Sequence, residues 1–524
     1  MSVTSMPPHR LAPSRLATSR FTLPESVRAL RLEFKRNAVP YVLPLLAAVF
    51  YFNTLRTADG FPPVWTLRAS AITDHMLFEF SAFAGGLAAW AGSRDGRRKT
   101  ADMVATTPRA AWARLSITLA GTLSWLLLAF LAGVAVLYIQ TALQATWGGP
   151  PLWPVFVGAA GVTVVTVIGF ACGVFFPGRF TAPLVAIVAL VLYQTGLRQA
   201  LSVTASGTYA LLSPANSPPV VDAGVYYHAA PDLSIVQVMF MGGIALALFG
   251  ALGLATTLRE LTPERGLASL RAALARTDGW LLRAVAVILV ACGVAASWTA
   301  FALAGTAKPD AVGGWQIPAL HSAASDQPVP AAPACTSSSG FQVCVHPAFS
   351  FYLSDVAEVL DPVAAEIAGL PGAPVSAKEV ASMIGGQDVP SGISGNPPVF
   401  EFTAERVGIY FGQFLGIPDP VGWREGFQQG LLDPFLAGPS QQAGSVSLGP
   451  AQQAVEDALL TAAGTNVPAT IGKMLQNGQP IAGPPAVRSA AQRFGALSAS
   501  ARHAWLAGHL AALRAGTITL AQIP

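Results

Sequence analysis

Residues Leu115–Ile139 read LSITLAGTLSWLLLAFLAGVAVLYI, an apolar run that contains no charged side chain. Roughly 20 such residues, wound into a helix, cross the hydrocarbon core of a bilayer. The run therefore predicts a membrane-spanning helix. Six more stretches before residue 305 have a similar character. In chain order the seven predicted spans are Val39–Leu55, Ala71–Gly92, Leu115–Ile139, Val155–Phe176, Thr181–Leu197, Ile235–Leu258 and Ala284–Ala304.

The composition of the whole chain agrees with this interpretation. Of its 524 residues, 52% are hydrophobic and only 11% are charged, whereas an average soluble protein carries roughly 25% charged residues. So few charges cannot cover the surface of a soluble domain of this size, and the hydrophobicity is too high for intrinsic disorder. The net charge of +4 gives no support for nucleic-acid binding.

Lys and Arg are distributed unevenly between alternate loops. Nineteen lie on the N-terminal side of the predicted membrane, and only Arg56, Arg68 and Arg198 lie on the other. Because cytoplasmic loops carry the excess of Lys and Arg, the N-terminus is predicted to be cytoplasmic. Seven crossings then place everything after Ala304 outside. We therefore expect an all-α polytopic protein of the cell membrane, with about seven transmembrane helices and a mainly helical α+β extracytoplasmic C-terminal domain.

Two segments on the cytoplasmic side have amphipathic patterns. Within residues 1–38, Leu23, Val27, Leu30 and Phe34 recur at helical spacing beside a basic stripe, which favours a helix lying in the membrane interface. The simpler alternative is a basic flank that only sets the orientation. Residues 259–283 predict a second interfacial helix, which leads into the seventh span.

The loop after the second span carries a dense run of charge. Residues 94–109 read RDGRRKTADMVATTPR, with Thr107 and Pro108 suited to begin a new helix. A short charged helix at the cytoplasmic surface can dock on a cytoplasmic partner, but a solvated anchor would have the same composition.

The order of these elements resembles a known family. RLEFKR at 31–36 precedes the first span, and AWAGSRDGRR at 89–98 ends the second and leads into the charged loop. This arrangement is similar to the membrane subunits of type-2 ATP-binding-cassette (ABC) exporters, particularly large actinobacterial-style permeases. The resemblance implies a six-span permease domain at 39–258, which forms half of a homo- or heterodimeric pathway, and separate cytoplasmic ATPase subunits that bind ATP and Mg.

The same resemblance implies a role for the charged loop. In that family this loop is the coupling helix that touches the ATPase, so the implied coupling residues are Arg94, Asp95, Arg97, Arg98, Lys99, Asp102 and Arg109. Two features depart from the basic six-span design, namely the seventh span at 284–304 and the large region that follows it.

The chain lacks the motifs of the common hydrolases. A phosphate-binding loop needs G-x-x-x-x-G-K-[ST], whereas Gly472-Lys473 is followed by Met474 and has no glycine at the required spacing before it. Neither H-E-x-x-H nor G-x-S-x-G occurs. We therefore do not expect this chain to be an enzyme. The alternatives to a permease are a membrane-anchored outer hydrolase and a sensor whose outer region binds a ligand.

The second span contains ionisable residues. His75 and Glu79 are four residues apart, so they share one face of a helix, and Asp74 lies beside them. Ionisable groups inside a membrane often mark a transport pathway or a proton relay. Alternatively, these residues lie near the outer end of the span, where water reaches them and Asp74 can cap the helix.

Beyond the seventh span we expect a linker at 305–334, rich in Ala, Pro, Gly and Ser, and then the domain at 335–524. Helical patterns occur at Phe351–Leu370 and Ser498–Ala515. Cys335 and Cys344 flank a Ser- and Gly-rich turn on the predicted outer side, where an oxidising environment favours a disulfide over two free thiols. The outer loop Arg198–Leu233 is expected to pack beneath this domain.

Overall fold

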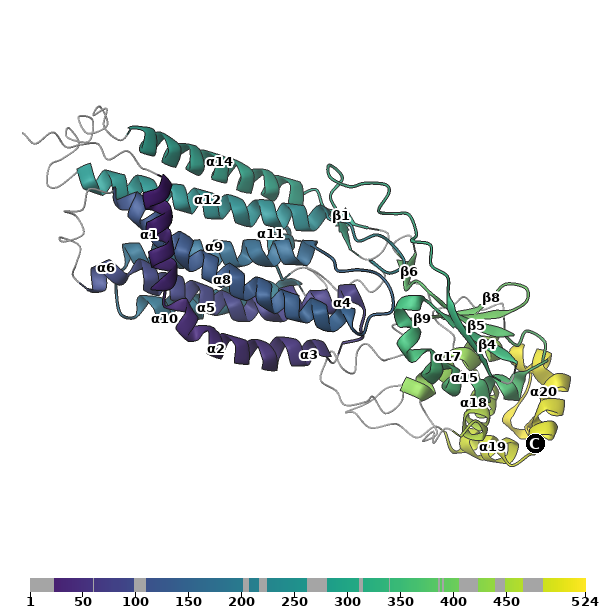
Figure 1. The fold of residues 1–524 in the computed structure, drawn as a ribbon. Helices are drawn as coiled ribbons and strands as arrows, with labels where there is room; N and C mark the ends of the chain where they lie inside the picture. Colours follow the sequence, from purple (N-terminus) through teal and green to yellow (C-terminus); the bar gives the residue numbers. More distant parts are fainter. Residues whose placement is uncertain are drawn as a thin grey trace, which may run out of the picture.

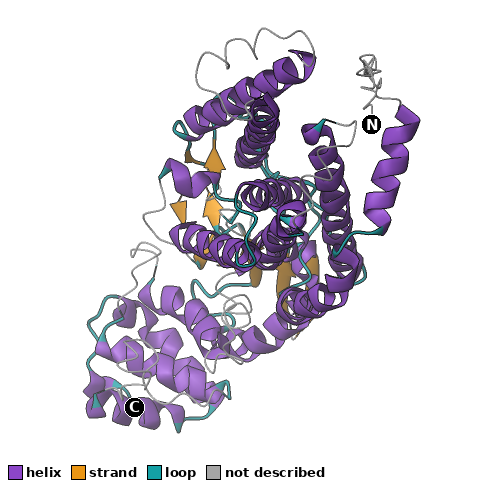
Figure 2. Cartoon of the chain, turned by 90° about the vertical axis from the view of Figure 1, so that its left-hand side faces the viewer, coloured by secondary structure: helices purple, strands orange, loops and turns teal. Residues whose placement is uncertain are grey.

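The computed structural model describes residues 23–59, 61–98, 110–200, 207–215, 224–261, 280–310, 314–338, 340–384, 387–388, 391–404, 423–438, 448–464 and 484–524. Within them the chain forms an elongated bundle of helices and a mixed domain beyond one end of the bundle (Figure 1). Figure 2 looks along the bundle, so that its helices are seen nearly end-on. The interfacial helix expected at 259–283 falls mostly outside the described residues.

The bundle begins with a short amphipathic helix, α1 (Leu23–Lys35), which runs across the others at one end (Figure 1). Two of the bundle's long helices contain a π-helical turn. One turn, η1 (Phe50–Leu55), joins α2 to α3, and the other, η2 (Ile72–Met76), joins α4 to α5. The remaining elements are α2 (Val39–Val49), α3 (Arg56–Asp59), α4 (Trp65–Ala71), α5 (Leu77–Gly92), α6 (Arg94–Arg97), α8 (Ala111–Ala142), α9 (Trp153–Phe175), α10 (Thr181–Ala200), α11 (Thr208–Leu212), α12 (Asp232–Leu261) and α14 (Trp280–Ala304).

Five helices of the described chain are long and apolar enough to cross a membrane. They are Val39–Ala58, Ala111–Ala142, Trp153–Phe175, Asp232–Leu258 and Trp280–Ala304. Of the other two predicted spans, 181–197 coincides with a shorter apolar helix, and 71–92 lies in the α4–α5 helix, which also carries Arg68. The chain is thus a mostly helical protein with the features of a membrane protein, and the seven-span count and the orientation stay predictions.

Glycines let neighbouring helices approach closely. A Cβ added at Gly169 or Gly173 of α9 would meet the backbone of α5, 2.9 Å from the Cα of Gly85 and the carbonyl carbon of Ala89 respectively. Small residues are enriched at helix interfaces in membranes because they bring backbones into van der Waals contact. The packing of α9 on α5 therefore depends on these glycines, and it places the second predicted span at the centre of the bundle.

The outer domain is built on a five-stranded sheet with the order β3-β4-β5-β9-β8. The β3–β4 and β8–β9 pairs are antiparallel, whereas β4 and β9 both lie parallel to the central strand β5. A helix, α15 (Leu353–Ile367), follows β4 and leads back to β5. The strands are β3 (Ala334–Ser338), β4 (Phe341–Val345), β5 (Ser376–Val380), β8 (Gly392–Ser394) and β9 (Val399–Thr403).

The C-terminal half of the outer domain is helical, and the chain ends at its far tip (Figure 1). The mainly helical α+β composition agrees with the expectation from sequence. The helices are α17 (Trp423–Ala437), α18 (Pro450–Ala462), α19 (Pro485–Gly495) and α20 (Ala499–Arg514), with 3₁₀ turns η3 (Pro347–Tyr352) and η5 (Leu520–Gln522). Short strands complete the described elements: β1 (Lys308–Pro309), β2 (Trp315–Gln316), β6 (Met383–Ile384) and β7 (Gln387–Asp388).

The expected linker at 305–334 makes more contacts than a loose connection would. It contains the β1–β2 pair, and Ile317 is fully buried against Ala300 and Ala304 of α14. The Ile317 amide donates a hydrogen bond to the buried Asp232 carboxylate at the start of α12 (3.0 Å). One apolar side chain and one buried carboxylate thus hold this segment on the bundle.

Candidate functional site

A cleft lies at the end of the bundle where α1 crosses it. The cleft has a volume of about 760 Å³ and is bounded by α1, the end of α5 and α6. Three interactions hold α1 and the residues after it against α8. The Trp125 ring stacks on Phe34 with centroids 4.3 Å apart, and its indole N–H donates to the Phe34 carbonyl (2.8 Å). The Asn37 side chain then donates to Thr122 (3.1 Å).

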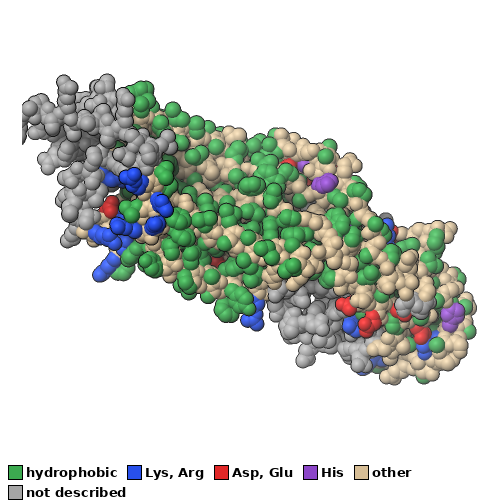
Figure 3. Space-filling model, viewed as in Figure 1, with side chains coloured by type: hydrophobic (Ala, Val, Ile, Leu, Met, Phe, Trp, Pro, Cys, Tyr) green, Lys and Arg blue, Asp and Glu red, His purple; other side chains and the backbone are tan. Residues whose placement is uncertain are grey.

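Arginines dominate the rim of this cleft. Arg94 forms an ion pair with Glu33 of α1 (2.7 Å) and lies 3.6 Å from the Asp95 carboxylate. The Arg97 guanidinium lies 3.4 Å above the Trp90 ring, a cation–π contact, and donates to the Trp90 carbonyl (2.8 Å). Burial, helped by the neighbouring Arg98 charge, lowers the pKa of Arg97. Basic side chains gather at this end in the space-filling view (Figure 3).

The implied coupling element is described only in part. Arg94, Asp95 and Arg97 lie in α6 and Arg98 follows it, whereas Lys99, Asp102 and Arg109 lie outside the described residues. A Cβ added at Gly96 would clash with Pro177, whose Cγ would be 2.8 Å away. The start of the charged loop therefore rests directly on the turn between α9 and α10. Its role in coupling stays a prediction.

Of the ionisable residues of the second span, Asp74 and His75 lie in the π-helical turn η2, and Glu79 lies in the first turn of α5. Asp74 accepts a hydrogen bond from Thr73 (3.3 Å) and lies near Tyr193 of α10. Glu79 is 4% exposed and faces Thr54 of the other π-helical turn, η1. The His75 ring lies 6.3 Å from the ring of Phe61.

This arrangement separates the two carboxylates, because each faces a different neighbouring helix. Glu79 is buried whereas Asp74 and His75 are half-buried, and both the pathway and the interfacial interpretations stay predictions. π-Helical turns are frequent at functional sites, and two of them in contact support the view that this part of the bundle has a role beyond packing. Within the described residues no group of His, Cys, Asp and Glu is arranged to hold a metal ion.

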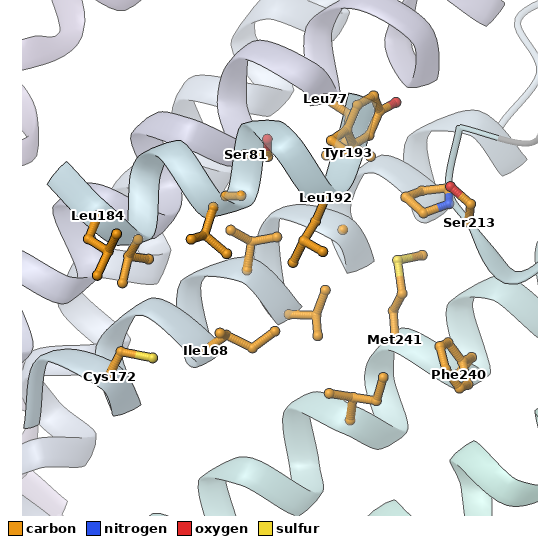
Figure 4. A pocket seen from close by; sticks show the side chains of 18 of the residues that line it. Leu77, Ser81, Ile168, Cys172, Leu184, Leu192, Tyr193, Ser213, Phe240 and Met241 are labelled. Carbon is orange, nitrogen blue, oxygen red and sulfur yellow. The ribbon is translucent and has the colours of Figure 1, made fainter. Parts of the chain in front are cut away.

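An apolar cavity of about 670 Å³ lies among α5, α9, α10, α11 and α12 (Figure 4). Aliphatic side chains such as Ile168, Leu192 and Met241 form most of its lining, and a few polar groups, including Ser81 and Tyr193, interrupt it. Sites for small molecules commonly measure 300–1,000 Å³ and have this apolar character with few polar groups. The cavity can therefore hold an apolar or amphiphilic molecule.

Sequence reasoning missed this cavity. Its lining comes from five helices, so it depends on how they are placed rather than on any one pattern. Gly161 of α9 gave a weak signal, because its missing side chain makes room for Leu77 of α5 at the cavity wall. Tyr193 lines the cavity and lies near Asp74. One of the residues predicted for a transport pathway therefore lies close to the cavity.

The outer domain rests on the loops of the bundle through His346, which follows β4. The imidazole ring packs between Trp147 (4.6 Å between ring centroids) and Tyr226 (4.8 Å). Burial lowers the pKa of His346 to about 4, so the ring is neutral at pH 7. Thr146 adds a hydrogen bond to the Pro347 carbonyl (2.6 Å). Tyr226 belongs to the outer loop that was expected to pack beneath this domain.

A second histidine fastens the segment between the bundle and the outer domain. His321 contacts Asp232 of α12 through Nδ1 (3.1 Å) and Asp326 through Nε2 (3.2 Å). Burial favours the neutral form of the ring. The hydrogen bonds and negative charges of the two carboxylates favour the protonated form more strongly, so the pKa of His321 is raised. The ion pairs of His321 and the aromatic packing of His346 thus hold the outer domain against the same end of the bundle.

Cys335 and Cys344 occupy facing positions of the β3–β4 hairpin, and their sulfurs are joined in a disulfide. Cys335 is exposed on the edge strand β3, whereas Cys344 is half-buried on the next strand, β4, so reagents reach Cys335 most readily once the bond is reduced. The other two cysteines, Cys172 and Cys292, are free and lie in α9 and α14.

Thiol labelling tests this bond and the orientation together. In a Cys172→Ser/Cys292→Ser background, a membrane-impermeant maleimide applied to intact cells should leave Cys335 and Cys344 unlabelled. After reduction it should label both, because the hairpin is predicted to lie outside. Labelling without reductant would show that the bond is absent. Labelling after reduction only in lysed cells would place the domain inside.

Comparisons of this chain with protein-family models, with curated proteins and with solved structures found no match.

Proposed function

We propose that this chain is the membrane-spanning permease subunit of an exporter powered by separate cytoplasmic ABC-type ATPase subunits. The observation that carries the transport part of the proposal is the apolar cavity of about 670 Å³ among five helices, which opens to the outside of the bundle along α10, where Leu184 and Leu192 are 61% and 66% exposed. An apolar cavity of this kind, lined by five helices, suits the passage of an amphiphilic molecule.

The ATP-driven part of the proposal rests on the resemblance and on the contacts of α6. Gly96 touches Pro177, and Arg94 is tied to Glu33 of α1. A force applied to α6 would therefore reach the interface helix and the α9–α10 turn. Because α9 and α10 line the cavity, motion at the cytoplasmic end would change its shape. Two such chains, identical or related, would complete the pathway.

Substitution of the coupling element tests the proposal. Exposed ion pairs each contribute only about 0–1 kcal/mol, so single changes should have little effect. The triple variant Arg97→Ala/Arg98→Ala/Asp102→Ala should lose ATPase binding and return ATP hydrolysis to the rate of the ATPase alone. The measurements are co-purification with an ABC ATPase from the same genome, and ATP hydrolysis in proteoliposomes.

The matched control is Arg28→Ala/Arg31→Ala/Lys35→Ala, which removes three exposed charges of α1. This control should retain ATPase binding and stimulation. Normal stimulation in a correctly inserted Arg97/Arg98/Asp102 variant would remove the loop from the mechanism. Failure of the wild-type chain to bind any adjacent ABC ATPase would refute the exporter proposal itself.

A further inference from the structure

We propose that the cleft between α1 and the α5–α6 junction binds the phosphate headgroup of an anionic phospholipid, with the acyl chains lying on its apolar floor. The site is at the cytoplasmic end of the bundle in the predicted orientation. This inference does not depend on the exporter proposal, because lipid binding is a property of the chain alone.

The charges of the cleft favour an anionic occupant. Four arginines line it against two acidic residues, and Arg94 already contacts both acids. Among the described residues no carboxylate pairs with the three remaining arginines, which are Arg36, Arg97 and Arg98.

The positions of these arginines make a phosphate a suitable counter-ion. Arg97 is held flat on Trp90, which orients its guanidinium, and Arg98 is close enough to affect the Arg97 charge. Two cations held near each other repel unless an anion lies between them. Guanidinium groups bind phosphate oxygens through paired N–H donors. Arg36 approaches from α1 on the other wall of the cleft.

The floor of the cleft favours a lipid over a soluble anion. Val39, Leu87 and Ala91 form it, and all three belong to predicted spans. Leu87 precedes Arg94 by seven positions, which corresponds to roughly 10 Å along a helix. The cleft therefore has charged side chains at its rim and apolar side chains at its floor. The distance between the two levels suits a phosphate headgroup and the first part of its acyl chains. Trp90, 48% exposed at this level, is typical of the membrane interface.

An acidic segment of a cytoplasmic protein is the competing occupant. It would satisfy the arginines, but it would leave the apolar floor without a partner. Basic pockets between helices on the cytoplasmic side of membrane proteins bind anionic headgroups for the reason seen here. A basic rim, together with an apolar floor that continues into the predicted spans, therefore favours a phospholipid over an acidic protein segment.

Native mass spectrometry of the full chain in detergent provides the test. Phosphatidylglycerol and phosphatidylcholine with the same acyl chains are titrated separately, and glycerol phosphate provides the headgroup without chains. The first lipid should bind at least tenfold more tightly than the second, and glycerol phosphate should not compete at the same concentrations. A basic residue near a membrane surface contributes about a fivefold preference for anionic lipid, so Arg36→Gln/Arg98→Gln should weaken phosphatidylglycerol binding by about 25-fold.

The control variant is Arg28→Gln/Arg31→Gln, which makes the same charge change on exposed positions of α1 that do not line the cleft. It should bind phosphatidylglycerol like the wild type, and Arg36→Lys/Arg98→Lys should retain most of the affinity. Thermal unfolding checks that all variants are folded.

Three results would overturn the proposal. They are equal binding of both lipids, equal loss in the control variant, and competition by glycerol phosphate alone, which would indicate a site for a soluble phosphate. Loss of ATPase binding in Arg36→Gln/Arg98→Gln, with lipid binding unchanged, would assign the cleft to a protein partner instead. Because Arg98 belongs to both tests, lipid binding and ATPase binding are measured on the same variant: loss of lipid binding with normal ATPase binding supports the lipid site and leaves the exporter proposal unaffected.

Discussion

Replacing Gly243 by leucine should separate α14 from α12, whereas the same replacement at the neighbouring Gly242 should leave the pair intact. A Cβ at Gly243 would clash with the hydroxyl of Ser297 and would lie 2.7 Å from the Gly293 carbonyl oxygen and 2.8 Å from the Ser297 amide nitrogen. Two of these atoms belong to the backbone of α14, so no side-chain rotation relieves the clash. A Cβ at Gly242 would meet nothing within 4 Å.

The expected effect is large because little else holds these helices together in a bilayer. Lipid tails are as apolar as leucine, so close packing replaces the hydrophobic effect as the main attraction between helices. Overpacking a core costs typically 1–3 kcal/mol when side chains can adjust, and here they cannot. We expect Gly243→Leu to lower the unfolding midpoint of the detergent-solubilised chain by roughly 10 °C.

The matched substitution makes this measurement specific. Gly242→Leu adds the same side chain to the same helix, and should shift the midpoint by no more than about 2 °C, within the range of ordinary surface changes. Equal shifts in the two variants would show that helix propensity or expression, rather than the contact with α14, determines stability. An unchanged midpoint in Gly243→Leu would contradict the packing of α12 on α14 described above.

Replacing Arg502 by methionine should unfold much of the outer domain. Its guanidinium makes two hydrogen bonds to the Glu366 carboxylate, at 2.6 and 3.1 Å, and also donates to the Leu497 carbonyl (2.6 Å). The two side chains are only 8% and 14% exposed. Removing one partner of a buried ion pair leaves an uncompensated charge, which costs about 3–5 kcal/mol. That cost is a large part of the stability of a typical domain.

Proteolysis of the full chain under increasing urea measures this loss. The control is the exposed pair of Arg424 and Glu358, whose charged atoms are 3.9 Å apart. Arg424→Met should cost less than about 1 kcal/mol, because exposed pairs contribute little. Glu366→Leu/Arg502→Met should be more stable than Arg502→Met alone, because neither charge then remains buried. Similar losses in the single and double variants would show that packing of the Arg502 side chain, rather than its charge, is what matters.

The features that could be predicted from sequence are those determined by neighbouring residues. Hydrophobic runs such as Leu115–Ile139 indicate membrane-crossing helices because transfer free energy is a sum over local side chains, and α8 extends through this run. Cys335 and Cys344 are separated by only nine positions, and a tight turn brings them together whatever the rest of the domain does. The mainly helical outer domain followed from amphipathic periodicity in the same way.

The features that sequence could not predict require residues far apart in the chain. Asp74 and Glu79 are an example: their spacing placed them on one helix, but only the packing shows that Asp74 lies near Tyr193 of α10 and that Glu79 faces Thr54 of η1. Likewise, the expected linker contacts the bundle, because the backbone amide of Ile317 donates a hydrogen bond to the buried carboxylate of Asp232.

Sequence by itself determined that this is a helical membrane protein with a mixed C-terminal domain, because hydropathy and periodicity are properties of short segments. Only the tertiary structure decided where the sites lie. The basic cleft needs α1 folded back across α5, and the apolar cavity needs five helices at particular crossings. Those crossings are set by small contact surfaces, such as Gly169 against Gly85 and Gly243 against Gly293. A glycine in a sequence does not reveal which backbone will lie against it, because that depends on the packing of all the helices at once.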